Sequence, residues 1–335
     1  MRVKKLNRFY ADYGIVVLMS LPPIGYHCGT GVGSNGIGFS SFLSKLHGQF
    51  PSFSAAQIFA ASPKSFAHCA WTPTTCNSVK LAVTELNIRL FIHAPYIINP
   101  CSWDDTAGAD PSSSSAARRD EPVAQRATGD NSSGKRLVSL VINLLQAGAR
   151  IAARGVVIHV GKSLKLGEAE GLRRMRGFFC AVLDAAKAGG VPCCRLLLET
   201  CAGQGTEVAR DLGVFGAFVK DIVGVYGAEA FGCCVDTCHV FACGYKMTGL
   251  AALVGEKIGW SNVGVIHLND SLTACCAHVD RHANIGEGKI GGEELAVFCK
   301  EAANALPGLP FVFETPESDD GSSRLSEMTW FVSLF

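Results

Sequence analysis

The sequence lacks a long hydrophobic run, an excess of charge of either sign, and any pair of C-x-x-C motifs. No apolar stretch approaches the ~20 residues that a membrane-spanning helix needs. The 335 residues carry a formal net charge of +1, so the chain is not a generally basic coat for nucleic acid. Without paired C-x-x-C motifs, a zinc ribbon is not expected.

Cysteine is abundant, but its pattern does not predict a disulfide framework. The 15 cysteines are an odd number, and several are adjacent in the sequence, at Cys193–Cys194, Cys233–Cys234 and Cys275–Cys276. Neighbouring residues of a strand point to opposite faces, which suits separate thiols better than disulfides. We therefore expect reduced thiols and an intracellular protein, with nucleus, cytoplasm and mitochondrion left open.

Acidic residues are missing from one long stretch near the N-terminus. None occurs between Asp12 and Glu85, whereas Lys45, Lys64 and Lys80 lie within it. A chance gap explains this equally well, but a locally positive surface would bind phosphate. The same stretch holds a G-x-G-x-x-G pattern at residues 31–36, and the acidic residue ~20 positions later that a dinucleotide site requires is absent.

Seven short apolar runs end on a residue that can bind a metal ion. They end on His27 ("PPIGYH"), His93 ("RLFIH"), His159 ("GVVIH"), Glu199 ("RLLLE"), Asp236 ("FGCCVD"), His267 ("VGVIH") and Glu314 ("PFVFE"). An eighth run, "AAQIFAAS" around Ile58, has the same character without the terminal ligand. Continuous apolar runs are typical of strands buried on both faces of a parallel sheet.

The segments between these runs have helical periodicity. Residues 167–190 place four apolar side chains on one stripe, namely Leu172, Phe179, Val182 and Leu183. Eight strand–helix units in succession predict an α/β protein with a (β/α)8 TIM barrel over residues 24–317. In this fold the active site lies at the C-terminal ends of the strands, where the seven ligand-type residues would meet.

Three segments fall outside the regular pattern. Residues 1–23 have a basic start and a short apolar stretch, which suits a signal peptide, an organellar presequence or, as we favour, a disordered extension. Residues 104–135 are rich in serine, alanine and charge, which predicts a flexible surface insertion. Residues 318–335 form a tail that either docks a last helix or is loose.

Histidine is scarce, yet it is concentrated at the ends of these runs. Four of the nine histidines close an apolar run. One such histidine is usually a hydrogen-bonded core residue, but that interpretation is poor for the whole set. Imidazoles together with carboxylates suit zinc or a related metal, and six of the seven residues, without His27, could hold two ions and a bridging carboxylate.

Two short motifs enlarge this set. "DTCH" carries Asp236 and His239 three residues apart, so a single helical turn after the strand brings both to one mouth. "VDRH" carries Asp280 and His282 on a loop before "NIGEGKIG". A D-x-H pattern is weak alone, but beside His239 it could supply a third metal.

Several stretches resemble the endonuclease IV family of apurinic/apyrimidinic (AP) endonucleases. They are "LLLETCAGQG", "CVDTCHVFACGY", "VIHLNDS", "HVDRHANIGEGKIG" and "FVFET", with looser matches in "FIHAPYIIN" and "VVIHVGKS". The resemblance runs from about Ile24 to Glu317 and leaves the serine-rich segment unmatched. It implies a barrel with three zinc ions at the C-terminal face of the strands.

The resemblance also implies which residues bind each ion. His93, His159 and Glu199 would hold one zinc. Glu199 would bridge to a second zinc, completed by Asp236, His267 and Glu314, and the third would lie between His239, Asp280 and His282. All nine positions keep a suitable residue. His27 is outside the family's ligand set, and we expect it to make a hydrogen bond near the site.

The activity implied by the resemblance is DNA repair by base excision. Such an enzyme hydrolyses the phosphodiester bond 5′ to an abasic site in duplex DNA and leaves a 3′-hydroxyl. Zinc suits this hydrolysis because it lowers the pKa of bound water to about 7 and neutralises phosphate charge. Glu199 is the residue on which we expect catalysis to depend most, because a bridging carboxylate sets the metal spacing.

DNA contacts are expected around the first loops of the barrel. The resemblance places Tyr96 and Ile97 where the family wedges an aromatic-aliphatic pair into the base stack. Lys64 stands where relatives often carry arginine, and Arg281 lies between two metal ligands. "HCGTGVG" replaces the family's "HVSAAGG" in the first of these loops. We expect the protein to act as a monomer.

Two other functions are compatible with parts of the pattern. A sugar isomerase or epimerase on the same barrel also uses His, Asp and Glu at strand ends, but it would not need the trio His239, Asp280 and His282. A catalytically dead protein that binds DNA lesions would keep the DNA surface, but the intact ligand set is evidence against it.

Overall fold

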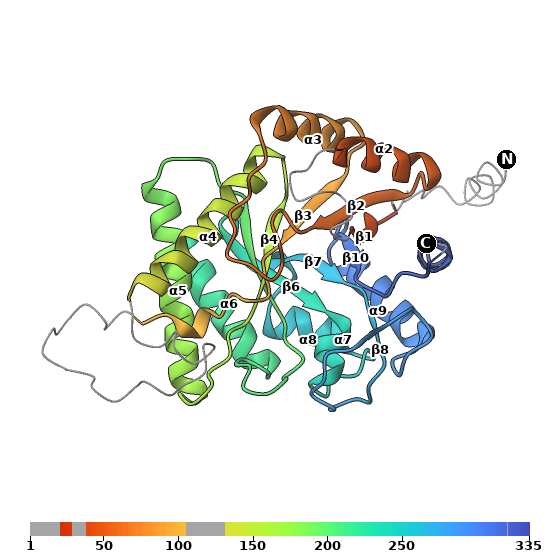
Figure 1. The fold of residues 1–335 in the computed structure, drawn as a ribbon. Coiled ribbons are helices and arrows are strands. Elements are labelled where there is room, and N and C mark those ends of the chain that lie inside the picture. Colours follow the sequence, from red (N-terminus) through yellow and green to blue (C-terminus); the bar gives the residue numbers. More distant parts are fainter. Residues whose placement is uncertain (1–20, 29–37, 105–130, 320) are drawn as a thin grey trace, which may run out of the picture.

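The computed structural model describes residues 21–28, 38–104, 131–319 and 321–335. A closed barrel of eight parallel strands is surrounded by helices (Figure 1). The strands are β1 (Ile24–Cys28), β2 (Phe53–Ile58), β3 (Arg89–His93), β4 (Gly155–His159), β5 (Arg195–Glu199), β6 (Phe231–Asp236), β7 (Val263–His267) and β10 (Phe311–Phe313). Each apolar run of the sequence forms one of them, and the predicted TIM barrel is confirmed.

The strands follow one another around the barrel in chain order, and β10 closes it between β7 and β1. All eight neighbouring pairs are parallel. The C-terminal ends of the strands therefore gather at one mouth, as the position of the ligand-type residues requires. Two very short strands, β8 (Asp270–Ser271) and β9 (His282–Ala283), pair antiparallel in the loop that follows β7.

One layer of buried side chains explains why the ligand-type residues point inward. A separate cluster of buried residues, one from each strand except β1, consists of Ala55, Phe91, Val157, Leu197, Cys234, Val265 and Val312. Residues two apart on a strand point to the same face. The residues two positions further on are Gln57, His93, His159, Glu199, Asp236, His267 and Glu314. The alternation of the strands thus aims seven polar side chains at the barrel axis.

The outer layer is formed by helices that alternate with the strands. They are α2 (Phe39–Gln49), α3 (Pro73–Glu85), α4 (Asn131–Arg150), α5 (Glu168–Ala188), α6 (Leu212–Tyr226), α7 (Thr237–Ala242), α8 (Leu250–Lys257), α9 (Gly292–Ala305) and α10 (Ser322–Val332). Most of the apolar core lies between these helices and the barrel, where Phe179 of α5 and Phe231 of β6 have ring centroids 5.4 Å apart. No described helix is long and apolar enough to cross a membrane.

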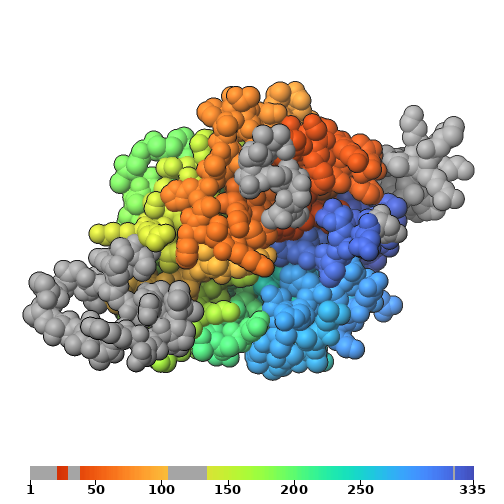
Figure 2. Space-filling model, in the orientation of Figure 1, coloured from red at the N-terminus to blue at the C-terminus, as the bar shows by residue number. Residues whose placement is uncertain are grey.

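The segments that the sequence set apart are only partly described. Helix α10 lies in the tail after residue 317, contacts β1 and buries Phe331 completely. Helix α4 begins at Asn131, within the segment interpreted as an insertion. Residues 1–20, the glycine pattern at 31–36 and residues 105–130 lie outside the described residues. Figure 2 shows the described segments in contact with one another on the face that it presents.

Replacing either of two glycines of α6 by alanine should change the stability of the protein, in opposite directions for the two positions. A Cβ at Gly216 would lie 2.2 Å from the carbonyl oxygen of Lys257, whereas a Cβ at Gly224 would meet no described atom within 4 Å. We expect Gly216→Ala to destabilise the protein by at least ~1–3 kcal/mol through overpacking. Gly224→Ala should stabilise it by about 0.5–1 kcal/mol through helix propensity. Urea unfolding measures both, and equal effects would contradict this packing of α6.

Candidate metal centre

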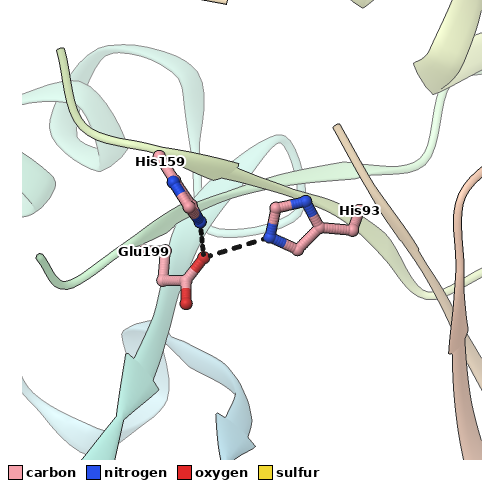
Figure 3. A group of neighbouring side chains, drawn as sticks. All are labelled: His93, His159 and Glu199. Carbon is pink, nitrogen blue, oxygen red and sulfur yellow. Dashed lines mark ion pairs between the residues drawn. The ribbon is translucent and has the colours of Figure 1, made fainter. Parts of the chain in front are cut away.

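Glu199 lies at the centre of the polar cluster at the barrel mouth. Its carboxylate is 1% exposed. On one side, Oε2 lies 3.1 Å from His159 Nε2 and 3.4 Å from His93 Nε2. Figure 3 shows the two imidazoles, from β4 and β3, converging on this oxygen. Three side chains that are far apart in the sequence therefore meet at the ends of three neighbouring strands.

The other oxygen of Glu199 faces a second group. Glu199 Oε1 lies 2.9 Å from His267 Nδ1, and the same nitrogen lies 3.0 Å from Glu314 Oε2. Asp236 Oδ2 is 3.8 Å from this nitrogen and fully buried. Three carboxylates thus surround one imidazole, and Glu199 belongs to both groups.

A third group stands at the edge of the first two. Helix α7 begins directly after Asp236 and brings His239 one turn further on. His239 Nε2 lies 3.3 Å from Asp280 Oδ2, and His282 Nε2 lies 3.2 Å from Asp280 Oδ1. His282 Nε2 is also 3.7 Å from Asp236 Oδ2. The structure therefore brings together all nine residues that the sequence singled out as ligands.

The donor atoms of these groups fit metal ions. Within each of the three sets that the sequence predicted, one ligand atom per residue lies within 4.8 Å of the others. Glu199 Oε2, His239 Nε2 and His282 Nε2 are buried and have no hydrogen-bond partner among the described residues. Buried polar atoms are rarely left unpaired, and imidazole and carboxylate are the ligands that zinc accepts. The barrel mouth is thus a candidate metal centre.

The charges of the cluster are mutually dependent. Burial raises the pKa of Glu199, but the imidazoles of His267 and His159 outweigh it and leave the pKa well below the usual range. Burial lowers the pKa of His239, but Asp236, Asp280 and Glu199 outweigh it and leave the pKa well above the usual range. Without metal, protons on the imidazoles therefore balance the carboxylates.

Several polar residues that the sequence analysis missed orient the ligands. Gln57 is fully buried; its Oε1 accepts from His267 Nε2 at 2.9 Å and its Nε2 donates to Glu314 Oε1 at 2.6 Å. The bond to Gln57 leaves His267 Nδ1 free to face the carboxylates. Asn269 likewise donates to Asp236 Oδ2 at 2.7 Å. The sequence could have identified Gln57 by its position. It points inward from β2 at the same level at which the ligands point inward from their own strands.

His27 behaves as the sequence analysis expected. Its Nδ1 lies 2.9 Å from Glu314 Oε1, so the predicted hydrogen bond near the site is confirmed. Its ring also packs against Phe59, with centroids 4.6 Å apart. Strands β1 and β2 provide none of the nine ligands. Their inward residues His27 and Gln57 instead both contact the ligand Glu314 at the end of β10, and Gln57 also contacts His267 of β7.

Two thiols lie among the ligands. Cys234 is within ligand distance of Glu199 and His267, and Cys238 is within ligand distance of Asp236 and His282. Burial raises the pKa of each thiol to about 12. Both thiols are therefore protonated at neutral pH and act as small, neutral neighbours of the cluster. All fifteen cysteines are free, as the sequence predicted.

An open cavity of about 610 Å³ leads to the cluster. Besides ligands, Tyr96, Asn99, Lys162 and Arg281 line it. Tyr96 is 54% exposed, and its ring centroid is 5.3 Å from that of His93 and 5.5 Å from that of His159. It therefore stands at the entrance, above the first ligand group.

The other two residues predicted to contact DNA lie beside this cavity rather than in its lining. Ile97 is half-buried next to Tyr96. Lys64 is exposed on the loop after β2, and this loop approaches Tyr96 because Tyr96 N donates to the Pro63 carbonyl at 3.1 Å. The structure thus gathers Tyr96, Ile97 and Lys64 on one side of the cavity and Arg281 on its rim.

Comparison with known proteins adds independent information. The family model described as xylose isomerase-like TIM barrel matches residues 124–331. The chain is 29% identical over 311 residues to a probable endonuclease 4 of Streptomyces coelicolor, covering 90% of this chain and 92% of the relative. It is 31% identical over 244 residues to a probable endonuclease 4 of Alkaliphilus oremlandii, covering 72% and 74% respectively.

Solved structures share the fold. Endonuclease IV from Thermus thermophilus superposes with a TM-score of 0.71 at 23% identity, covering 93% of this chain and 99% of that one. A D-tagatose 3-epimerase-like protein superposes with a TM-score of 0.60 at 16% identity, covering 93% and 97%. The fold is therefore common to nucleases and epimerases, and sequence similarity decides between them. The chain belongs to the endonuclease IV family, within the xylose isomerase-like TIM barrels.

Proposed function

We propose that this chain is a zinc-dependent AP endonuclease that hydrolyses the phosphodiester bond 5′ to an abasic site in duplex DNA and leaves a 3′-hydroxyl. Membership of the endonuclease IV family supports a DNA-cleaving hydrolase. The observation that carries the proposal is the position of Glu199, whose two carboxylate oxygens face two different ligand groups. A carboxylate shared in this way suits two metal ions held close together.

The nine ligand-type residues would hold three zinc ions. His93 and His159 with Glu199 would bind the first ion, and Asp236, His267 and Glu314 with Glu199 the second. His239, Asp280 and His282 would bind the third. When bound, zinc supplies an activated water at neutral pH and neutralises charge on the scissile phosphate. Gln57 and Asn269 fix the orientation of His267 and Asp236, so the donors are aligned before substrate arrives.

The cavity beside the centre would receive the DNA backbone. Arg281 offers positive charge on its lining, and Lys64 offers it on the neighbouring loop. Lys162 also lines the cavity, but its charge is paired with Glu207 at 3.7 Å. Tyr96, exposed at the entrance, is placed to stack against or wedge between bases, with Ile97 beside it. Extruding the abasic nucleotide toward the ligands would require such a wedge.

The alternatives are less well supported. An isomerase or epimerase would share the fold and the first two ligand groups, but the third group has no role in that chemistry. A protein that only binds lesions would have no need for three complete ligand sets. We also propose that the protein acts as a monomer and that it lies inside the cell. The location inside the cell suits its fifteen free thiols.

Replacing the shared carboxylate should abolish the activity. Glu199→Gln removes the charge that two ligand groups share, so we expect loss of bound zinc and a fall in incision of more than about 100-fold. Zinc content by mass spectrometry and cleavage of a duplex with one abasic site measure both effects. Glu256→Gln, an exposed glutamate on α8, is the matched control. Equal cutting by the Glu199 variant would contradict the mechanism.

Tyr96 should affect DNA binding without affecting metal binding. Tyr96→Ala removes an aromatic surface, and we expect an abasic duplex to bind about 5- to 150-fold more weakly, which corresponds to ~1–3 kcal/mol of stacking. Zinc content should not change. Leu81→Ala, which removes an equally exposed apolar side chain on α3, is the control. Unchanged DNA affinity in the Tyr96 variant would remove this residue from the DNA interface.

Zinc binding to the chelator-treated protein should release protons. Burial lowers the pKa of His282, but Asp280 and Asp236 outweigh it and raise the pKa to about 9. Histidine binds zinc only when neutral, so at neutral pH the ion must displace protons. The zinc affinity should therefore rise as the pH increases from neutral toward the raised pKa of His282. Calorimetry in buffers of different ionisation enthalpy measures this, and buffer-independent heats would contradict it.

A further inference from the structure

The third ligand group is built differently from the other two. Asp280 and His282 stand on the loop between β8 and α9, whereas the first two groups come from the ends of barrel strands. Strand β9, which contains His282, is paired only with the two-residue strand β8. The path of the loop therefore decides whether these side chains face His239.

A buried carboxylate outside the ligand set holds this loop. Asp270 is fully buried. Its oxygens accept hydrogen bonds from the backbone N–H groups of Ser271 (2.7 Å), Gly286 (3.0 Å), Gly288 (3.1 Å), Ile290 (2.9 Å) and Gly291 (3.2 Å). Bonds of this kind to an ionised carboxylate are about twice as strong as neutral ones. A single side chain thus ties β8 to the far end of the loop.

The loop can approach this carboxylate only because it is rich in glycine. A Cβ at Gly288 would lie 2.3 Å from Asp270 Oδ1 and 2.5 Å from the carbonyl oxygen of Ser271. Any larger residue at this position would push the loop away from Asp270. The sequence "NIGEGKIG" is therefore matched to the carboxylate that it surrounds.

A second buried carboxylate reaches the same loop from the C-terminal helix. Glu327 of α10 is 3% exposed. It accepts hydrogen bonds from Asn284 Nδ2 (3.1 Å), Ile285 N (3.1 Å) and Thr315 Oγ1 (2.8 Å). Asn284 directly follows β9, and Thr315 directly follows the ligand Glu314. Helix α10 thus joins the loop of the third group to the strand end of the second.

Both carboxylates hold residues that follow His282 in the loop. His282 Nδ1 lies 3.2 Å from the backbone carbonyl oxygen of Glu314 and donates to it. This bond leaves Nε2 to face Asp280 and Asp236. The ring can make it only while the loop and the end of β10 keep their present distance.

We infer that Asp270 and Glu327 are positioning residues for the third metal site and are not needed for the other two. The inference rests on the proposed function, since it assigns residues to one of the three zinc sites. It also gives the C-terminal tail a role in the active site. The first two ligand groups should stay intact when these residues change, because barrel strands carry them. Glu314, next to the Glu327 partner Thr315, is also held by His27, Gln57 and Asn269.

The test compares zinc binding by variants of Asp270, Gly288 and Glu327, which we call the clamp. Asp270→Asn keeps the size of the side chain but replaces one acceptor oxygen by a donor, and Gly288→Ala pushes the loop off the carboxylate. Glu327→Met removes the contact from α10. Gly292→Ala is the control, because a Cβ there would meet only ordinary contacts, the nearest at 3.5 Å. Each chelator-treated protein is titrated with zinc, and its fold is checked by circular dichroism.

We expect the native chain and Gly292→Ala to bind three zinc ions and each clamp variant to bind two at the same free zinc concentration. Incision should fall about 10- to 100-fold in the clamp variants and recover in excess zinc. If one of the three variants does not fold, the other two still test the inference.

Three tightly bound ions in the folded clamp variants would overturn the inference alone. A native chain that binds no zinc or does not cut abasic DNA would instead overturn the proposed function.

Discussion

The cost of burying a carboxylate determines the organisation of this site. Glu199 is 1% exposed, and the nitrogens of four histidines lie within 3.4 Å of its oxygens. Among the described residues, no lysine or arginine forms an ion pair with it. A buried charge without compensation costs several kcal/mol, so protons on the imidazoles or metal cations must supply the positive charge. Zinc binding would therefore replace the protons on the imidazoles by metal cations. The proposed hydrolysis depends on these cations.

Much of this arrangement could be predicted from the sequence because strand alternation is a local rule. Each apolar run ending on a ligand type forms a barrel strand, and the parallel order brings the ends to one mouth. The same rule places Gln57 among the inward residues, although glutamine carries no metal-ligand signal. Its function follows only from the neighbours His267 and Glu314, which are distant in sequence. Hydrogen-bond partners of this kind are set by tertiary packing and have no sequence period.

The loop and the tail were the least predictable parts for the same reason. Asp270 follows β7 as one polar residue among several, and nothing local shows that a glycine-rich segment will surround its carboxylate. The tail after residue 317 left a docked helix and a loose end equally open. Burial of Phe331 and Glu327 decides for docking. Helix α10 contacts β1 at the other end of the chain, and Glu327 binds residues of the loop after β9 and of the end of β10.

Side chains from six barrel strands, helix α7 and one loop converge at the barrel mouth, and we propose that they bind several cations. The most direct measurement is a crystal structure of the protein grown with zinc, with anomalous scattering recorded at the zinc absorption edge. We expect three peaks, of which two lie on opposite sides of the Glu199 carboxylate and the third lies between His239, Asp280 and His282. A map with no peak beside Glu199 would contradict this proposal.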